Sequence, residues 1–433
     1  MIFGWRFGKI HPVRVLRIVI IMIAVVLLGL LLYQIPSVQS RLDWGFTQIS
    51  TYLRGVINPI GVMPTSIGVS SHSGSVTPSA TASPPPPTPS EPTAAPLPSP
   101  TPLPPSVYLQ PPDLIIQEQN NCGPASLAMY LSFYGWDLSF YDWIEDQGLE
   151  KQAFIASIIR PVTGDRNVNV EELDLFTREN VGWLNTQYRV GGDIELLKTF
   201  IANGIPVMIE EGDALAQQYW PGDDMWAGHF LLITGYDDAA QSFYAQDSFR
   251  QQDRQVTYAD TDSRWRYFNR VYILIYHPNQ EETVKQILGS HWDLDYNRQH
   301  ALDIAQAETD ADPRDALAWF NLGTNLVYFE RYDEAARAYD EAREIGLPQR
   351  MLRYQFGPFH AYFHSLRTED LLALIEYALT ITPNSEEAWL WRGWVLWRLG
   401  DNAGAIKAFR RSYKENPNSF FAQNALDFMG VTP

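Results

Sequence analysis

Residues 117–131 read QEQNNCGPASLAMYL and contain Cys122, the only cysteine of the chain. Two asparagines precede this cysteine and a Gly-Pro pair follows it, so Cys122 stands at a turn. Apolar residues beyond the turn recur at helical spacing, and no further helix breaker occurs before Gly135. The sequence therefore predicts a helix of about three turns that begins beside Cys122.

This position makes Cys122 a candidate nucleophile. Unpaired N–H groups and the positive end of the dipole at a helix N-terminus favour a thiolate, which is the reactive form of cysteine. A lone cysteine is otherwise usually a small apolar side chain in a core. The polar run of glutamines and asparagines before Cys122 argues against an apolar pocket. Both interpretations stay open until other residues are considered.

Composition limits the classes of function. The length of 433 residues predicts two folded domains with additional segments. The net charge of −18 argues against a nucleic-acid partner, because binding to phosphates depends on clustered Lys and Arg. A single cysteine excludes an intramolecular disulfide, a Cys-rich zinc site and an iron–sulfur centre. No cofactor is predicted.

Residues 1–36 predict a basic cytoplasmic flank and a transmembrane anchor. The run from Ile18 to Tyr33 is apolar, and with its neighbours (residues 15–35) it reaches the roughly 20 residues that span a bilayer. The basic residues before it are Arg6, Lys9, Arg14 and Arg17. This asymmetry predicts a cytoplasmic N-terminus and extracytoplasmic folded domains in the cell membrane. A cleaved signal peptide is the alternative, although no small-x-small cleavage site follows.

The next two segments connect this anchor to the folded part. Residues 37–62 are a juxtamembrane segment, in which residues 41–62 are compatible with a short amphipathic helix. Residues 63–112 are rich in Pro, Ser and Thr, and such a composition cannot bury enough apolar surface to offset the entropy of ordering. This segment is predicted to be a disordered, extended stalk.

Residues 113–280 predict an α+β domain. Besides the Cys122 helix, helices are expected after the N-cap Asn169 and over residues 193–201. Strands are expected at residues 205–210, 228–238, 243–247 and 270–276. His229 lies near the start of the second strand and Asp247 ends the third. A hairpin of these two strands brings His229 and Asp247 together.

These residues suit nucleophilic catalysis. A thiolate requires a base, the base requires an orienting group, and an oxyanion requires hydrogen-bond donors. Cys122, His229 and Asp247 can take the first three roles, and the side-chain amide of Gln117 can supply the donor. Each can also be structural: His229 a residue at a strand end, Asp247 a turn cap and Gln117 a solvated loop residue. The rival candidates are His277 for the base, Asp237 or Asp238 for the acid, and Gln119 for the donor.

The two motifs resemble those of the papain-like peptidases of cysteine peptidase family thirty-nine. These are the double-glycine leader peptidases of bacteriocin exporters and their stand-alone relatives. The resemblance covers residues 112–278, through Gln117-x4-Cys122-Gly-Pro-Ala-Ser and Gly228-His229-Phe-Leu-Leu-Ile-Thr-Gly-Tyr-Asp. It implies a Cys122–His229–Asp247 triad with Gln117 as the oxyanion donor. In the family the aspartate is commonly followed by proline, whereas Ser248 follows it here.

Residues 281–433 carry a repeat. The pairs Leu288-Gly289, Leu322-Gly323 and Phe356-Gly357 recur every 34 residues, and Arg392-Gly393 follows after 36. This pattern resembles the tetratricopeptide repeat, and it predicts four all-α units with an insertion in the third and a capping helix near residues 419–429. Such a solenoid has a groove that binds a protein or peptide partner; a structural or dimerisation role is the alternative. Trp391, Trp394 and Trp397 line that groove or fill the core between repeats.

The combined prediction is a membrane-anchored extracytoplasmic cysteine peptidase whose repeats bind a protein or peptide. Two alternatives remain. The papain-like domain is inactive and the protein is an adaptor that acts through its repeats, or the same Cys–His–Asp order serves an amide transferase of the transglutaminase type.

Overall fold

The computed structural model describes residues 36–66, 102–141, 149–162 and 167–433, together with residues 17, 20–24, 27–29 and 33. The chain divides into two units by its contacts. One comprises residues 1–60 and 217–223, and the other comprises residues 61–216 and 224–433. Among the residues that the structure describes, no helix has both the length and the apolar character needed to cross a bilayer. Most of the predicted anchor at residues 15–35 lies outside the described residues.

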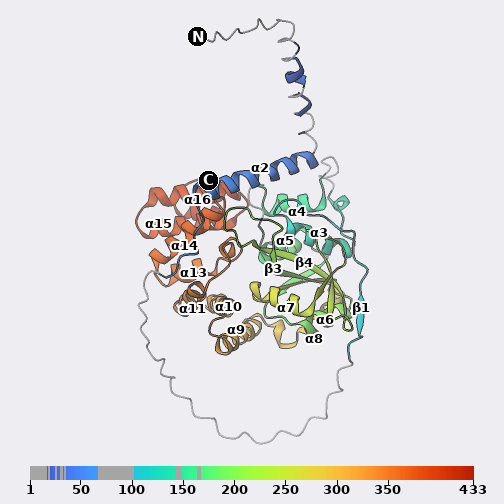
Figure 1. The fold of residues 1–433 in the computed structure, drawn as a ribbon. Coiled ribbons are helices and arrows are strands. Elements are labelled where there is room, and N and C mark those ends of the chain that lie inside the picture. The colour runs from blue at the N-terminus through green and yellow to red at the C-terminus, as the bar shows by residue number, and fades with distance from the viewer. Residues whose placement is uncertain are drawn as a thin grey trace, which may run out of the picture. The chain divides into compact units, whose positions relative to one another are not determined.

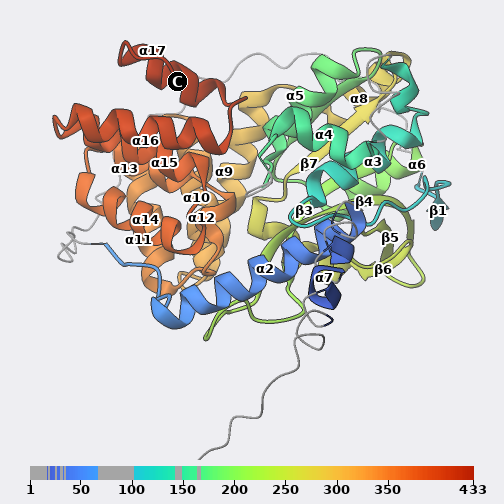
Figure 2. The same cartoon turned by 90° about the horizontal axis from the view of Figure 1, so that it is seen from above.

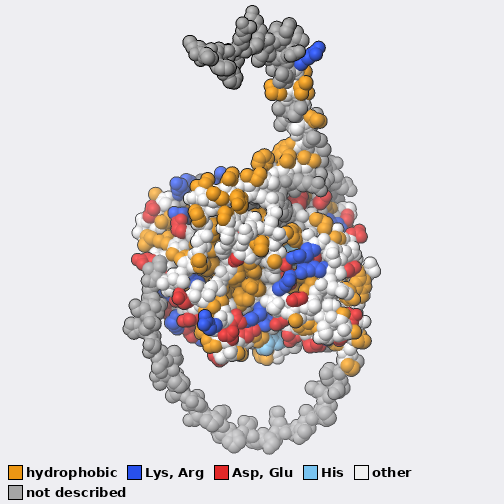
Figure 3. All heavy atoms as spheres, viewed as in Figure 1, with side chains coloured by type: hydrophobic (Ala, Val, Ile, Leu, Met, Phe, Trp, Pro, Cys, Tyr) orange, Lys and Arg blue, Asp and Glu red, His pale blue; other side chains and the backbone are white. Residues whose placement is uncertain are grey.

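The first unit contains the helix α2 (Pro36–Ile57), which is longer at its N-terminal end than the predicted amphipathic helix. Apolar side chains at a helical spacing of three and four residues are exposed along it. They are Leu42, Phe46, Ile49, Leu53 and Val56. Figure 3 shows hydrophobic side chains gathered along this helix. Gly55 contacts Trp220 of the same unit, where an added Cβ would lie 2.5 Å from the tryptophan Cβ.

The second unit contains an antiparallel sheet with helices packed around it (Figure 1). The strands among the described residues are β1 (Ser106–Tyr108), β2 (Asn185–Arg189), β3 (Val207–Ala214), β4 (Trp226–Asp237), β5 (Ser242–Gln246), β6 (Arg254–Thr257) and β7 (Tyr272–Tyr276). Their order is β2-β7-β3-β4-β5-β6, and β1 pairs with β4. The long central pair β3–β4 runs from Val207 opposite Ile233 to Ala214 opposite Trp226. The predicted strands are therefore confirmed.

Helices pack on this sheet and complete the sheet domain, residues 102–292. They are α3 (Cys122–Phe133), α4 (Lys151–Ile159), α5 (Val170–Asn180), α6 (Ile194–Ala202), α7 (Tyr258–Trp265) and α8 (Glu281–Leu288). Figure 2 shows α3, α4 and α5 beside one another. The main core joins α6 and α8 to the strands through Phe200, Ile209, Leu274 and Leu288. The predicted N-cap Asn169 forms a full capping box with Glu172.

The boundaries of the stalk differ from the prediction. Residues 102–112 belong to the sheet domain, because β1 pairs with β4 and Tyr236 Oη donates to Pro104 O at 2.7 Å. At the other end, Met63 is buried and Arg343 Nε donates to Pro64 O at 2.8 Å. Residues 67–101 of the predicted stalk lie outside the described residues. A short strand within a Pro-rich stretch has no local signal that would separate it from the stalk.

The helical region, residues 294–433, follows the sheet domain. Its helices are α9 (Leu294–Ala311), α10 (Ala316–Tyr328), α11 (Tyr332–Ile345), α12 (Met351–Tyr354), α13 (Gly357–His364), α14 (Thr368–Ile381), α15 (Glu386–Arg398), α16 (Asn402–Glu415) and α17 (Phe420–Phe428). The structure describes every residue of this region. Its repeat units are the helix pairs α10–α11, α13–α14 and α15–α16, and α17 is the predicted capping helix.

The predicted first repeat unit is wrong. Its helix, α8, has Val284 and Leu288 in the core of the sheet domain. Gly289 ends that helix with a positive φ of 52°, a conformation in which glycine is favoured, so the Leu-Gly pair imitates the repeat without belonging to it. The later glycines do allow helices to approach closely. An added Cβ at Gly323 would lie 2.8 Å from the Tyr339 ring, and one at Gly393 would lie 2.3 Å from the Phe409 ring.

Candidate active site

Cys122 is the first residue of α3, as the sequence predicts. The turn before it uses Asn120 with φ 56°, a left-handed conformation that asparagine tolerates better than most residues, and Asn121 N donates to Glu118 O at 3.2 Å. The next residue, Gly123, is needed for close packing, since a Cβ there would lie 2.3 Å from Val168 Cγ2. The sulfur is therefore placed at a helix N-terminus, and Val168 packs against the residue that follows it.

His229 and Asp247 meet where β4 begins and β5 ends. His229 Nε2 lies 2.8 Å from Asp247 Oδ1, and the two residues are 5% and 0% exposed. Cys122 lies near enough to the imidazole to act on its pKa. Burial lowers the pKa of His229, but the hydrogen bonds to Asp247 and Cys122 and the negative charge on both outweigh it and raise the pKa to about 10. The structure thus brings together the three residues predicted to form the triad.

Asp247 is held as an anion by several donors. Its Oδ1 accepts from Phe249 N at 2.9 Å, and its Oδ2 accepts from Arg254 Nη1 at 2.7 Å. Burial raises the pKa of Asp247, yet His229, the Phe249 N–H and Arg254 outweigh it, so that the pKa lies well below its usual value. A carboxylate fixed in this way orients the imidazole and stabilises its protonated form.

Gln117 lies beside the residue that follows Asp247. Its backbone N–H donates to Ser248 O at 2.9 Å, and its Oε1 accepts from Ser248 Oγ at 2.9 Å. Because the side-chain oxygen is engaged by Ser248, the amide NH2 is the end of Gln117 that can donate elsewhere. Ser248 is fully buried. Ser248, which follows Asp247, thus fixes the oxygen end of the Gln117 side chain.

The loop before the nucleophile is held by Gln152 of α4, which the sequence gives no reason to select. Gln152 Oε1 accepts from Glu118 N and from Asn121 Nδ2, both at 3.0 Å, and its Nε2 donates to Ile116 O at 2.9 Å. Its side chain is 1% exposed. One buried amide therefore ties together the backbone on both sides of Gln117 and the residue before Cys122.

Two buried acids of β3 also border the site. Glu211 is the cross-strand neighbour of His229, and neither of its carboxylate oxygens has a hydrogen-bond partner among the described residues. Burial raises the pKa of Glu211 to about 7, against the lowering effect of His229 and of Arg254, whose Nη1 lies 3.7 Å away. Glu210 is buried near Cys122, and burial and the charge on Cys122 raise its pKa well above the usual value.

The rival candidates lie elsewhere. His277 follows β7 and contacts the Tyr134 and Trp183 rings at 5.0 and 5.7 Å. Asp237 accepts from Ala239 N at 2.8 Å in the hairpin turn, and Asp238 pairs with Lys198 at 2.9 Å. These residues are structural. Gln119 is half-buried in the turn before Cys122 and stays a weaker candidate for the donor.

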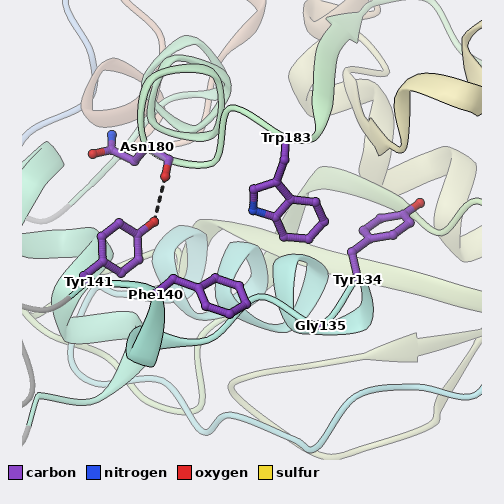
Figure 4. A pocket seen from close by; sticks show the side chains of 6 residues that line it. All are labelled: Tyr134, Gly135, Phe140, Tyr141, Asn180 and Trp183. Atoms are coloured by element: carbon purple, nitrogen blue, oxygen red, sulfur yellow. Dashed lines mark hydrogen bonds between the residues drawn. The ribbon is translucent and has the colours of Figure 1, made fainter.

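A separate cavity of about 550 Å³ lies at the far end of α3 (Figure 4). Trp183 and Phe140 face each other there with ring centroids 6.5 Å apart, and Tyr141 Oη donates to Asn180 O at 2.7 Å. The cavity is lined by Tyr134, Gly135, Phe140, Tyr141, Asn180 and Trp183, none of which is a base or a nucleophile at neutral pH. Among the described residues, no group of three or more His, Cys, Asp and Glu side chains is arranged to hold a metal ion.

Comparisons with known proteins agree with these two architectures. The model of the Peptidase_C39 like family matches residues 108–275, and a tetratricopeptide repeat model matches residues 369–420. The comparison with curated proteins found no match.

Solved structures resemble parts of the chain. A C39-like peptidase from Bacillus anthracis is 18% identical, with a TM-score of 0.29 and coverage of 39% of this chain and 96% of that one. A double glycine motif protease from an AMS/PCAT transporter, in complex with the leader peptide, is 18% identical, with a TM-score of 0.27 and coverage of 40% and 94%. YrrB, a TPR protein with an unusual peptide-binding site, is 18% identical, with a TM-score of 0.27 and coverage of 35% and 82%. Residues 108–275 therefore match the model of the Peptidase_C39 like family, and residues 369–420 match that of the tetratricopeptide repeat.

Proposed function

We propose that the sheet domain is a thiol-dependent peptidase. The observation that carries this proposal is the position of His229, whose Nε2 lies 2.8 Å from Asp247 Oδ1 and whose pKa is raised by Asp247 and by the nearby Cys122. A buried imidazole held between a carboxylate and a thiol at a helix N-terminus favours an imidazolium–thiolate pair.

The residues take the following roles in hydrolysis. The Cys122 proton resides on His229, and the thiolate attacks the carbonyl carbon of a peptide bond. The Cys122 N–H and the Gln117 amide donate to the oxyanion, and His229 passes its proton to the leaving amine. A water molecule, deprotonated by His229, then attacks the thioester carbon and releases the acid and the Cys122 sulfur. Asp247 keeps the imidazole oriented throughout.

Alkylation of Cys122 tests the proposed ion pair. Iodoacetamide at pH 6 should modify Cys122 much faster than a model thiol, and His229→Ala should remove most of this excess rate, because the thiolate loses its counter-ion. Labelled casein incubated with the protein should be cleaved by the wild type and not by Cys122→Ser. Labelling at the model-thiol rate in both the wild type and His229→Ala would indicate that the domain is catalytically inactive. Incorporation of an amine into casein without cleavage would identify an amide transferase.

The helical region is proposed to bind a peptide or a protein segment. A cavity of about 1480 Å³ lies between α13, α15 and α17 on one side and α4, α5 and β2 on the other. Trp391 and Trp394 line it, and so does Glu386, whose buried Oε2 has no hydrogen-bond partner among the described residues. Peptides selected from a random library on the wild type should lose binding to Trp391→Ala and keep binding to Trp319→Ala, which alters a tryptophan that does not line the cavity. Equal loss in both variants would argue against this groove.

Membrane anchoring through residues 15–35, with the folded domains outside the cytoplasm, is also a proposal. The apolar run and its basic flank support it. The exposed apolar side chains of α2, which directly follows, are typical of a helix that lies at a membrane surface. In cells, the protein should resist extraction from membranes by alkaline carbonate, and protease added outside the cytoplasmic membrane should digest the sheet domain. Release by carbonate would indicate a cleaved signal peptide or a peripheral protein.

A further inference from the structure

The insertion in the helical region approaches the candidate active site. Residues 349–355, here called the α12 segment, connect α11 to α13 and interrupt the regular spacing of the helix pairs. Met351 and Leu352 are 0% and 2% exposed and fix the segment within the protein. The rest of the segment contacts the sheet domain at Trp226 of β4 and at Asn167, in the loop before α5.

On the β4 side the contacts lead up to His229. Gln349 and Asp224 exchange two hydrogen bonds, in which Gln349 N donates at 2.7 Å and Asp224 N donates at 3.3 Å. Arg350 Nη1 donates to Trp226 O at 3.1 Å, and the Arg350 side chain is buried. These contacts fix the α12 segment to the strand residues that come directly before Gly228 and His229.

On the α3 side the segment contacts the loop that packs against the nucleophile. Asn167 Nδ2 donates to Arg353 O at 2.9 Å. The next residue of that loop, Val168, is the one that lies against Gly123. One short segment therefore contacts both the loop that packs against Gly123 and the strand residues before His229.

Tyr354 is the residue of this segment that packs on β4 next to His229. An added Cβ at Gly228 would lie 2.9 Å from Tyr354 Cδ1, so the ring packs directly on the backbone next to His229. The Trp226 ring meets the Tyr354 ring edge-on with centroids 5.5 Å apart. Burial raises the pKa of Tyr354, and negative charge on Cys122 raises it further, as expected for a phenol close to the sulfur.

We propose that Tyr354, supplied by the helical region, lies beside Cys122 and determines which substrates reach the sulfur. Together with Phe268 its ring fills the space over Gly228, and it limits the size of the groups that fit next to the sulfur on that side. The helical region is then part of the substrate site as well as a separate binding surface. This inference rests on the proposed peptidase function.

Two reagents of the same chemistry and different size test the proposal on the full-length protein. Iodoacetamide and 5-iodoacetamidofluorescein both alkylate Cys122, and the ratio of their rates measures the room around the sulfur. Tyr354→Ala should raise the bulky-to-small ratio by about tenfold or more, a size of effect typical of a changed pocket wall. Tyr354→Phe should leave the ratio unchanged, because the ring remains. The matched control is Tyr332→Ala. Tyr332 is a half-buried tyrosine of α11 whose ring stacks on His364 of α13, and its loss should also leave the ratio unchanged.

The outcomes separate the inference from the function on which it rests. An unchanged ratio in folded Tyr354→Ala overturns the inference, while rapid iodoacetamide labelling still supports the peptidase. Labelling of the wild type at the rate of a model thiol overturns the peptidase, whatever the ratio does. Tyr354→Leu provides a second variant that keeps apolar packing on Trp226 with a shorter side chain, and its ratio should lie between those of the wild type and Tyr354→Ala. A ratio equal to that of the wild type in this variant also counts against the inference.

Discussion

Among single residues, Ser248 offers the clearest prediction for the proposed reaction. Its hydroxyl donates to Gln117 Oε1, so Ser248→Ala should free the side chain of the predicted oxyanion donor to rotate. This should lower kcat for casein hydrolysis by about tenfold, which is less than the effect of removing a whole donor. Iodoacetamide labelling of Cys122 forms no oxyanion and should be unaffected. Ser248→Thr keeps a hydroxyl and should restore part of the activity. If labelling and hydrolysis fall together in Ser248→Ala, the hydroxyl supports the fold and not the donor.

Glu211 should make stability depend on pH. Burial raises its folded-state pKa from 4.5 to about 7, so the folded protein prefers the neutral carboxyl. Below pH 4.5 the carboxyl is neutral in both the folded and the unfolded protein, so burying it takes nothing from the free energy of unfolding. Between pH 4.5 and pH 7 that free energy decreases by about 3 kcal/mol. Glu211→Gln cannot ionise. Its free energy of unfolding in urea, compared with that of the wild type, should therefore rise between pH 5 and pH 8. A constant difference between the two proteins across this range would contradict the raised pKa.

At the scale of helices and strands, local signals explain most of what the sequence predicted. The Asn169 capping box and the Asn203-Gly204 helix end are short-range features, and both are present in the structure. The hairpin that joins β4 and β5 follows from the Asp-Asp turn and the alternation of its strands, and it brings His229 to Asp247 without further information. These parts of the site depend on residues near in sequence or on one hairpin.

The remaining elements depend on contacts that no local pattern records. Gln152 is one glutamine among many until its amide is seen to join Ile116, Glu118 and Asn121. The same holds for Tyr354, which lies more than two hundred residues after Cys122 and reaches it only because the α12 segment is fixed to Asp224 and Asn167. The β1 strand is hidden by the proline-rich composition around it. Sequence alone gives such residues no distinguishing feature.

The close approach of α15 and α16 predicts an unusual response to a glycine substitution. Gly→Ala within a helix normally stabilises it by about 1 kcal/mol. At Gly393 the new Cβ would lie 2.3 Å from the Phe409 ring, so Gly393→Ala should instead lower the free energy of unfolding by about 2 kcal/mol, as overpacked cores do. The double variant with Phe409→Leu should recover part of this loss. Urea unfolding followed by circular dichroism measures both, and a stabilised single variant would show that the helices can separate freely.

For the whole molecule, buried polar contacts predict that the sheet domain and the helical region unfold together. Asn297 of α9 is 2% exposed and accepts from Val190 N at 3.1 Å while donating to Val190 O at 2.9 Å. A second contact joins the two parts: Asn269 Nδ2 of the sheet domain donates to Asn325 Oδ1 of α10 at 2.8 Å. Asn297→Ala leaves two backbone groups of the sheet domain unpaired, which should cost about 2 kcal/mol.

The elements that open more often in Asn297→Ala show whether the sheet domain and the helical region unfold together or independently. Hydrogen exchange monitored by mass spectrometry should show equal acceleration in β3 and in α11 of Asn297→Ala, because opening either part exposes the same interface. Gln299→Ala, two residues along the same helix at an exposed position, should change stability by less than about 0.5 kcal/mol. Acceleration confined to α11 would mean that the helical region opens by itself. In that case Tyr354 would move away from Cys122 during such openings, and bulky thiol reagents would reach Cys122 of the wild type at the opening rate.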